Sequence, residues 1–203
     1  MGRGGLSRQR SFALSYRRHA GDRWRENVQQ LGASIVFSRP KARHSQNAYV
    51  TNDLDRALSI WRDDYGVPEF YVFENDTPGL VSSPEYRMKI ALANVGGMEI
   101  ELIEPLPGLA PMHAEVLPQD GSFAMCFHHA ALRVDGELGD FEEYMASLDP
   151  AVHPVVWSGG LGDLMRYTYT DERATLGHYL EHVWFDARMY EQMASAIPVY
   201  PTR

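Results

Sequence analysis

Four polar residues stand at nearly equal separations in two parts of the sequence. Gln46 and Glu101 are 55 positions apart, and His129 and Glu181 are 52 positions apart. An imidazole, two carboxylates and an amide oxygen suit a borderline-hard divalent cation, with coordination positions left for water or a substrate. The sequence therefore predicts that a fold which brings these four side chains together forms a metal site.

The elements around the first pair are predicted from hydrophobic periodicity and turn signals. Leu54, Leu58 and Trp61 have the i, i+4, i+7 spacing of one helix face, and they follow Asp53, a capping residue. The helix is expected to end near Gly66. Strand-like runs cover residues 46–51, 69–74, 86–94 and 97–103. The predicted order is a strand, a helix and three strands.

The same order of elements returns in the second part. Strands are expected at 128–134, 154–157, 164–170 and 178–184, and a helix at 141–148. Gly97 and Gly177 each stand four positions before the glutamate of a final strand, which supports a repeat. The predicted fold class is therefore α+β, with two βαβββ modules whose curved mixed sheets form a cup-shaped site.

Alternation along each strand decides which side chains can share that site. Glu99 and Glu101 lie on one face of their strand, and the opposite, apolar face is expected under the helix. In the second module, strict alternation directs His128 and His182 away from the face that carries the proposed ligands.

The chain divides into a central domain with an extension at each end. The predicted parts are an Arg-rich, flexible extension (1–42), module one (43–105), a Pro/Gly-rich linker (106–122), module two (123–186) and a helical tail (187–203). Residues 1–30 hold seven Arg against Asp22 and Glu26, although the whole chain carries a net charge of −8. An organellar transit peptide is the alternative interpretation of this extension.

Composition excludes several classes of protein. With 44% hydrophobic and 23% charged residues, the usage is that of a globular protein rather than a disordered or collagen-like chain. No uninterrupted apolar run reaches the ~20 residues of a bilayer-spanning helix, so no membrane partner is expected. The acidic balance argues against nucleic acid. A single cysteine, Cys126, favours a reducing, cytoplasmic location.

Segments 46–58, 98–105, 128–134 and 177–181 carry the four proposed ligands. Together they resemble the ligand-bearing strands of the vicinal oxygen chelate superfamily. This superfamily includes glyoxalase I, methylmalonyl-CoA epimerase, extradiol dioxygenases and fosfomycin or bleomycin resistance proteins. The resemblance spans residues 44–186 and implies the superfamily's paired βαβββ modules.

The ligand set is most similar to that of glyoxalase I. Most members have a His seven residues before an Asp-Leu pair, and this chain has Gln46 at that position before Asp53. The resemblance implies a divalent metal ion (Zn, Ni or Co) and a catalytic base at Glu181, with Glu101 on the opposite face of the substrate. The implied activity is that of an isomerase or lyase that acts, through an enediolate, on a small α-oxygenated carbonyl compound or its thiol adduct.

Three alternatives remain open within the same superfamily. Epimerases usually place Gln where this chain has Glu101. Extradiol dioxygenases, with Fe or Mn, need a second His, which His44, two residues before Gln46 on the same face, could supply. A non-catalytic protein of the resistance type, which binds a small molecule without turnover, is the third alternative.

Substrate contacts and assembly follow from the same expectations. Arg133 alternates onto the face of His129, and Trp157 is a candidate wall of the pocket, so both are predicted to bind a small-molecule substrate. A homodimer is expected, because such folds often complete a site across a two-fold axis.

Overall fold

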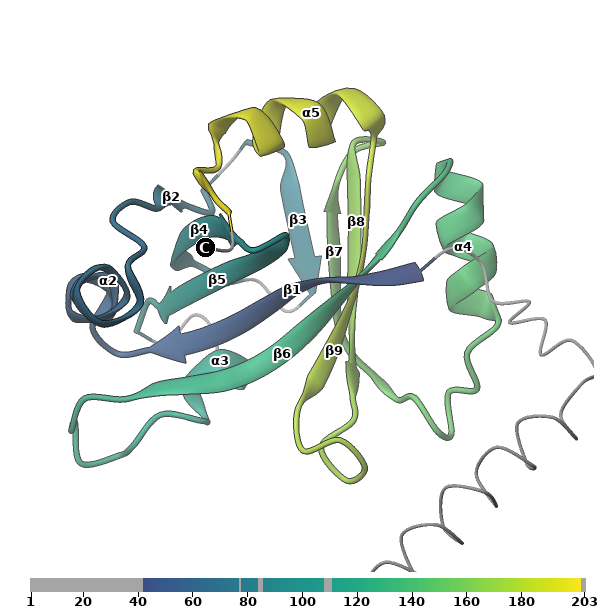
Figure 1. Ribbon diagram of the computed structural model, residues 1–203. Coiled ribbons are helices and arrows are strands. Elements are labelled where there is room, and N and C mark those ends of the chain that lie inside the picture. Colours follow the sequence, from purple (N-terminus) through teal and green to yellow (C-terminus); the bar gives the residue numbers. More distant parts are fainter. Residues whose placement is uncertain (1–41, 77, 84–85, 108–110, 202–203) are drawn as a thin grey trace, which may run out of the picture. The chain divides into compact units, whose positions relative to one another are not determined.

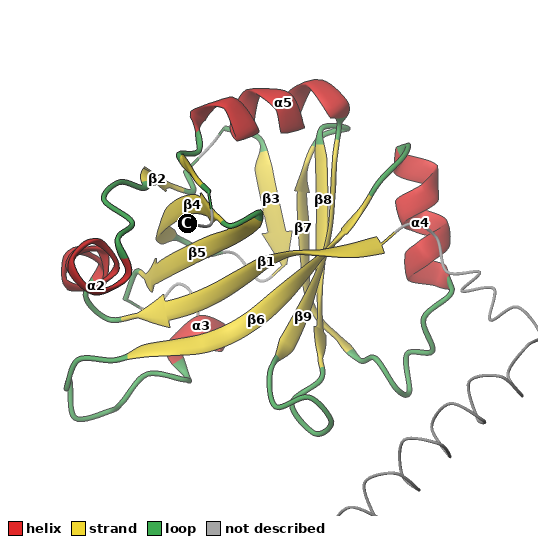
Figure 2. Cartoon of the chain, viewed as in Figure 1, coloured by secondary structure: helices red, strands yellow, loops and turns green. Residues whose placement is uncertain are grey.

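The computed structural model describes residues 42–76, 78–83, 86–107 and 111–201, which form a strongly curved mixed sheet with helices around it (Figures 1 and 2). The predicted α+β fold class is confirmed. The extension predicted over 1–42 lies outside the described residues except for Ala42, which begins the first strand.

The elements follow the predicted order, with additions. The strands are β1 (Ala42–Thr51), β2 (Tyr71–Glu74), β3 (Leu80–Ser83), β4 (Met88–Val95), β5 (Met98–Pro105), β6 (Met125–Val134), β7 (Val155–Leu161), β8 (Met165–Asp171), β9 (Tyr179–Phe185) and β10 (Val199–Tyr200). The helices are α2 (Leu54–Tyr65), α3 (Pro111–Ala114), α4 (Leu138–Ala146) and α5 (Ala187–Ala196).

The strands form one sheet rather than two separate ones. Their order is β10-β4-β5-β1-β6-β9-β8-β7-β3, and β2 pairs with β4 off this path. The first strands of the two modules, β1 and β6, pair antiparallel at the centre, whereas each pairs in parallel with the last strand of its own module, β5 or β9. The central strands therefore bring the two modules' proposed ligands to one region.

The helix of the first module begins and ends where its sequence signals predict. The Asp53 side chain accepts a hydrogen bond from the Arg56 backbone nitrogen at 2.9 Å, and Gly66 ends the helix at a φ of 71°. The apolar face of β5 lies under this helix, as predicted, in a buried cluster of Leu54, Ala57, Ala91, Ile100 and Leu102. The other face of β5 is thereby left for the site.

Three elements were not predicted, and two of them connect the halves of the sheet. Strand β3 from the first module pairs with β7 of the second, and β10 from the tail pairs with β4 of the first. The third, α3, lies in the predicted linker. The predicted tail helix is present as α5, which leads from β9 to β10 (Figure 1).

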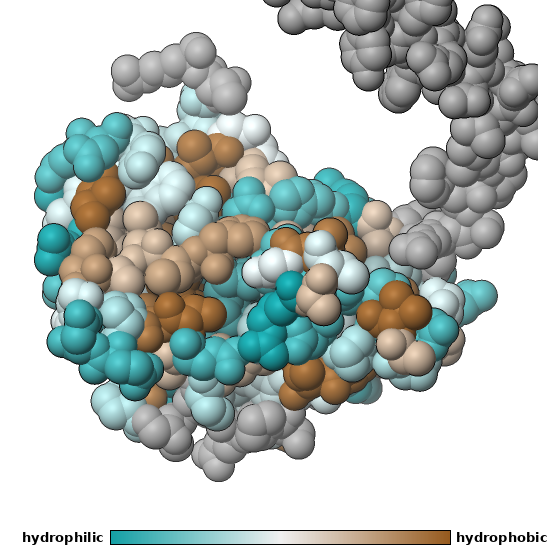
Figure 3. Space-filling model, turned by 90° about the horizontal axis from the view of Figure 1, so that it is seen from below, coloured by the Kyte–Doolittle hydropathy of each residue, from teal (hydrophilic) through white to brown (hydrophobic). Residues whose placement is uncertain are grey.

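The face seen from below carries hydrophobic residues in separate groups (Figure 3). Seen from below, these groups are interspersed with hydrophilic residues (Figure 3). Within the described ranges, the helices are all too short or too polar to cross a lipid bilayer.

Candidate functional site

The strand register places the four predicted ligands around two small residues, Ala48 and Ala131. Across β1 and β6, Gln46 lies opposite Ala131 and Ala48 lies opposite His129. Along the parallel ladders, Ala48 is level with Glu101, and Ala131 is level with Glu181. The two rows across the sheet are therefore Glu101–Ala48–His129 and Gln46–Ala131–Glu181. Each row has an alanine between two ligands, which leaves space above the sheet.

The imidazole of His129 is the point on which the two carboxylates converge. Its Nε2 lies 3.4 Å from Glu101 Oε2 and 3.6 Å from Glu181 Oε2, and 3.4 Å from the hydroxyl of Tyr169. Ligand atoms that each lie about 2.1 Å from one ion are roughly 3.0–3.5 Å apart. These separations are therefore compatible with ligands of a common ion.

The amide of Gln46 has a defined orientation. Its Nε2 donates a hydrogen bond to Glu99 Oε1 at 2.7 Å, and its Oε1 is buried without a hydrogen-bond partner among the described residues. A buried acceptor of this kind is costly unless something binds it. Because carbonyl and carboxylate oxygens suit hard and borderline cations, the residues present fit a divalent metal ion.

One prediction about side-chain direction is wrong, because β6 contains a β-bulge. Ala48 pairs with His129 and the next residue, Tyr49, pairs with Phe127, so His128 is the additional residue of β6. The bulge turns His128 to the side of His129, where the two Nδ1 atoms are 2.9 Å apart. His182 does point away, as predicted, and its Nδ1 lies 2.9 Å from the Tyr144 hydroxyl of α4.

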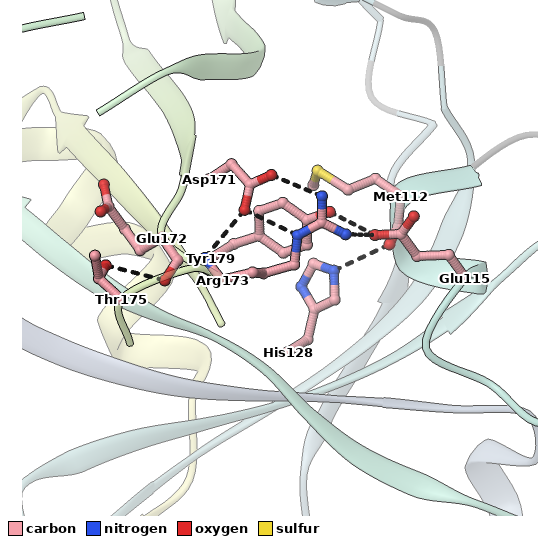
Figure 4. Close-up of polar contacts among 8 residues, drawn as sticks. All are labelled: Met112, Glu115, His128, Asp171, Glu172, Arg173, Thr175 and Tyr179. Carbon is pink, nitrogen blue, oxygen red and sulfur yellow. Dashed lines mark hydrogen bonds and ion pairs between the residues drawn. The ribbon is translucent and has the colours of Figure 1, made fainter. Parts of the chain in front are cut away.

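The hydrogen bonds of His128 determine how His129 presents its ring. His128 Nε2 lies 3.2 Å from the backbone carbonyl of Met112, which can only accept, so this nitrogen carries the proton (Figure 4). Burial lowers the pKa of His128 to about 3, so the ring is neutral and its Nδ1 accepts from His129 Nδ1–H. A neutral His129 therefore has its lone pair on Nε2, toward Glu101 and Glu181.

Helix α3 supports this arrangement from the linker. Its end is held by Glu115, whose carboxylate accepts from Arg173 Nη1 at 2.8 Å and from the Tyr179 hydroxyl (Figure 4). His113 of the same helix is buried and stacks on His128, with 4.5 Å between ring centroids. The helix thus places both the Met112 carbonyl and a flat ring against His128.

His113, His128 and His129 also form a group of possible metal ligands, with one nitrogen of each within 4.8 Å of the others. Both ring nitrogens of His128 already have hydrogen-bond partners, however. The group therefore has fewer available lone pairs than the predicted set around His129 Nε2.

The site has an excess of negative charge when no cation is present. Burial raises the pKa of Glu99 to about 7, with a further contribution from the charge of Glu101, and burial also raises the pKa of Glu101 itself. Burial alone would lower the pKa of His129, but hydrogen bonds and charges from Glu101 and Glu181 outweigh it and raise the value to about 9. A bound cation would supply this positive charge in place of the proton on His129.

The predicted site residues are distributed around a cavity of about 280 Å³. Gln46, Glu101, Glu181 and Trp157 line it, and His129 is buried beneath it. The position of Arg133 differs, since it is not one of the described residues that line the cavity. Its guanidinium donates to Asp135 at 2.9 and 3.0 Å and stacks on the Tyr190 ring at 3.9 Å.

Two further residues of the site were not predicted to have a role. Glu99 lies on the predicted site face of β5, and Tyr169 is level with Glu181 across β8 and β9. Alternation alone indicates the direction of Glu99, whereas Tyr169 becomes a neighbour of His129 only through the pairing of strands distant in sequence.

A family model described as the Glyoxalase/Bleomycin resistance protein/Dioxygenase superfamily matches residues 45–169. No curated protein matches the chain significantly. Among solved structures, methylmalonyl-CoA epimerase from Mycobacterium tuberculosis gives a TM-score of 0.51 at 15% identity, covering 78% of this chain and 97% of its own. A variant of the Streptomyces coelicolor epimerase in complex with 2-nitronate-propionyl-CoA gives a TM-score of 0.49 at 19% identity, and the match covers 71% of this chain and 98% of the epimerase. A hypothetical protein from Bacillus halodurans C-125 gives a TM-score of 0.45 at 18% identity, and the match covers 71% of this chain and 95% of that protein.

Proposed function

Because the chain belongs to the glyoxalase/bleomycin resistance protein/dioxygenase superfamily, also called the vicinal oxygen chelate superfamily, we propose that it is a metal-dependent, glyoxalase-like isomerase or lyase. Its substrate is a small α-oxygenated carbonyl compound or the thiol adduct of one. Gln46, Glu101, His129 and Glu181 hold the divalent ion, which is Zn, Ni or Co.

The observation that carries the proposal is the convergence of two carboxylates on one imidazole nitrogen. Glu101 and Glu181 come from strands on opposite sides of the central pair and lie 3.4 and 3.6 Å from His129 Nε2. Both line the same cavity. Two carboxylates that reach a substrate from different sides can remove a proton at one position and return it at another.

The residues act by moving a proton. Glu181 takes a proton from the carbon next to a carbonyl, and the electron pair of the broken C–H bond moves toward the carbonyl oxygen. A carboxylic acid, Glu181 or Glu101, then returns a proton to the former carbonyl carbon. The hydroxyl of the first carbon becomes the new carbonyl and its proton passes to the other oxygen, so that the isomerisation consumes no other reactant. When bound, the divalent ion supplies positive charge that stabilises the enediolate.

The donor set favours proton transfer over the dioxygenase alternative. The iron site of that class requires two His and one carboxylate, and His129 is the one histidine of the predicted set. His44 lines the cavity, but it is exposed, and its Nε2 lies 3.0 Å from Asn47 Oδ1 and 3.1 Å from the Gln46 carbonyl oxygen. The epimerase alternative fits the ligand set less well, because epimerases usually have Gln where this chain has Glu101.

The test is proton exchange by the metal-reconstituted full chain in D₂O. Hemithioacetals, acyl-CoA thioesters and catechols are screened by NMR for deuterium incorporation next to the carbonyl and by an oxygen electrode for dioxygen uptake. Deuterium incorporation into the hemithioacetal of an uncharged thiol is the expected result. Glu181→Gln should reduce it by at least about 100-fold, as expected for a lost general base, while Glu142→Gln, an exposed carboxylate of α4, should leave it unchanged.

Three results would contradict the proposal in different ways. Exchange retained in Glu181→Gln would refute the assignment of the base. Dioxygen uptake with iron would favour the dioxygenase. Less than a few tenths of an equivalent of metal after reconstitution would favour a binding protein of the resistance type.

We also propose that the chain forms a homodimer in a reducing, cytoplasmic compartment. The single cysteine, Cys126, fits such a compartment. Light scattering should give twice the monomer mass at micromolar concentration. A monomer mass would exclude a site completed by a second copy.

A further inference from the structure

The cavity that the proposed ligands line also has many apolar wall residues, and the part of the cavity that these residues bound is here called the apolar chamber. It is formed by side chains of the sheet and of α5, among them Met88, Ile90, Trp157, Met165, Phe185 and Met193. Met88, Ile90 and Trp157 belong to the buried core. Part of the chamber's wall is therefore made by the folded interior of the sheet.

Helix α5 forms one wall of this chamber. Met189, Tyr190 and Met193 line the cavity, whereas Glu191 and Gln192 of the same helix are exposed. The helix lies across the top of the sheet in Figure 1, between β9 and the short β10, which pairs with β4. Because it is tied to both halves of the sheet, this methionine-bearing face is held over the cavity. Methionine adapts well to apolar ligands.

The charges around the cavity disfavour an anionic substrate group. Arg43 is the only Arg or Lys among the described residues that line it, and Arg43 Nε already pairs with Asp135 at 3.1 Å. Three carboxylates, Glu99, Glu101 and Glu181, line the same cavity. Because the proposed ion would neutralise Glu101 and Glu181, the disfavoured anion is one placed away from the ion, which would lose its hydration and find no unpaired Arg or Lys among the described lining residues.

The polar groups of the chamber are neutral ones. Asn75, Tyr86 and Tyr167 line it, and they offer amide and phenol groups. Trp157 adds a large flat surface, stacked on Tyr169 with 5.2 Å between ring centroids. Such a lining accepts hydrocarbon or aromatic groups and neutral oxygens.

From this lining we infer that the substrate carries an uncharged, largely apolar body, aromatic or aliphatic, attached close to the pair of oxygens that faces the ligands. The inference rests on the proposed function, since the metal site defines where the oxygens lie. It excludes one class of compound as the main substrate: a carbonyl compound joined to a negatively charged thiol. In this proposal the apolar chamber, which α5 bounds, binds the apolar part of the substrate. The metal site binds its two oxygens.

The test compares three hydroxamates that share one bidentate oxygen head. Acetohydroxamate, benzohydroxamate and 4-carboxybenzohydroxamate are titrated by calorimetry into the zinc-loaded full chain. Burial of the phenyl ring should make benzohydroxamate bind at least about tenfold more tightly than acetohydroxamate. The added carboxylate should abolish that gain.

A matched pair of variants locates the effect. Met193→Glu should remove the preference for benzohydroxamate over acetohydroxamate, whereas Gln192→Glu on the exposed face of α5 should keep the preference. Met189→Glu replaces Met193→Glu if the latter does not fold.

The outcomes separate the two proposals. Equal affinity for the first two hydroxamates, or tighter binding of the carboxylated one, would overturn the inference about the substrate body and leave the metal site standing. If none of the three binds to the zinc-loaded chain, the proposed chelating function fails and the inference fails with it.

Discussion

Glu99 accepts a hydrogen bond from the side-chain amide of Gln46, with 2.7 Å between Glu99 Oε1 and Gln46 Nε2. When Glu99 is ionised its carboxylate can only accept, so the contact then determines which end of the amide faces Glu99. The other end, Oε1, is the buried atom without a partner among the described residues. Glu99 therefore turns the carbonyl oxygen of Gln46 toward the proposed ion. Glu99 is not itself one of the four predicted ligands.

The first prediction concerns this orientation. Glu99→Gln should weaken zinc binding by about 10–100-fold, because an amide at position 99 can also donate and no longer specifies how Gln46 is turned. Competition with a chromophoric chelator measures the affinity. Glu142→Gln is the control, and an unchanged affinity in Glu99→Gln would show that Gln46 is oriented by other means.

The second prediction concerns the chain of contacts from Met112 through His128 to His129. Long-range ¹H–¹⁵N spectra of the metal-free protein should show His128 neutral, with its proton on Nε2. His128→Leu removes the acceptor for His129 Nδ1–H and should weaken zinc binding by about 10–100-fold. His128→Gln retains an acceptor and should recover part of the loss. A proton found on Nδ1 of His128 would contradict the assigned tautomer.

The third prediction concerns the space that the alanines leave between the ligands. Ala131 is 1% exposed, lies between Gln46 and Glu181 across the sheet and lines the cavity. Ala131→Leu should displace both neighbours and weaken zinc binding by at least about tenfold, with an overpacking cost of about 1–3 kcal/mol in stability. Ala130→Leu, on the other face of β6, is the matched control. Equal zinc affinity in the two variants would show that this space is not needed.

The fourth prediction concerns the stability that the ion provides. Free zinc at 100 times its Kd should stabilise the native state by about 2.7 kcal/mol, which corresponds to a Tm increase of about 5–10 °C for a chain of this size. Differential scanning calorimetry with zinc and with EDTA measures the shift. Glu101→Gln should remove most of it, because a ligand is lost. An equal shift in that variant would place the ion elsewhere, and the histidine group that includes His113 would be the next site to examine.

The sequence by itself determined the class of fold and the four central positions. Helix and strand periods are local properties, so Leu54, Leu58 and Trp61 were sufficient to predict α2, and alternation was sufficient to predict the two faces of β5. The nearly equal spacing of ligand types in two modules predicted that Glu101, His129 and Glu181 would meet, and the structure places them together.

Only the tertiary structure decided how those positions are completed. The bulge at His128 depends on how many residues of β6 face each residue of β1, and alternation within one strand cannot reveal that. Strands β3 and β10 are too short for a periodic signal and exist because a distant strand supplies their hydrogen bonds. Likewise, the sequence predicted α5 as a helix, but its role as a wall of the cavity follows from the pairing of β10 with β4. A sequence pattern records local preference, whereas the environment of a side chain is set by neighbours that only folding brings into contact.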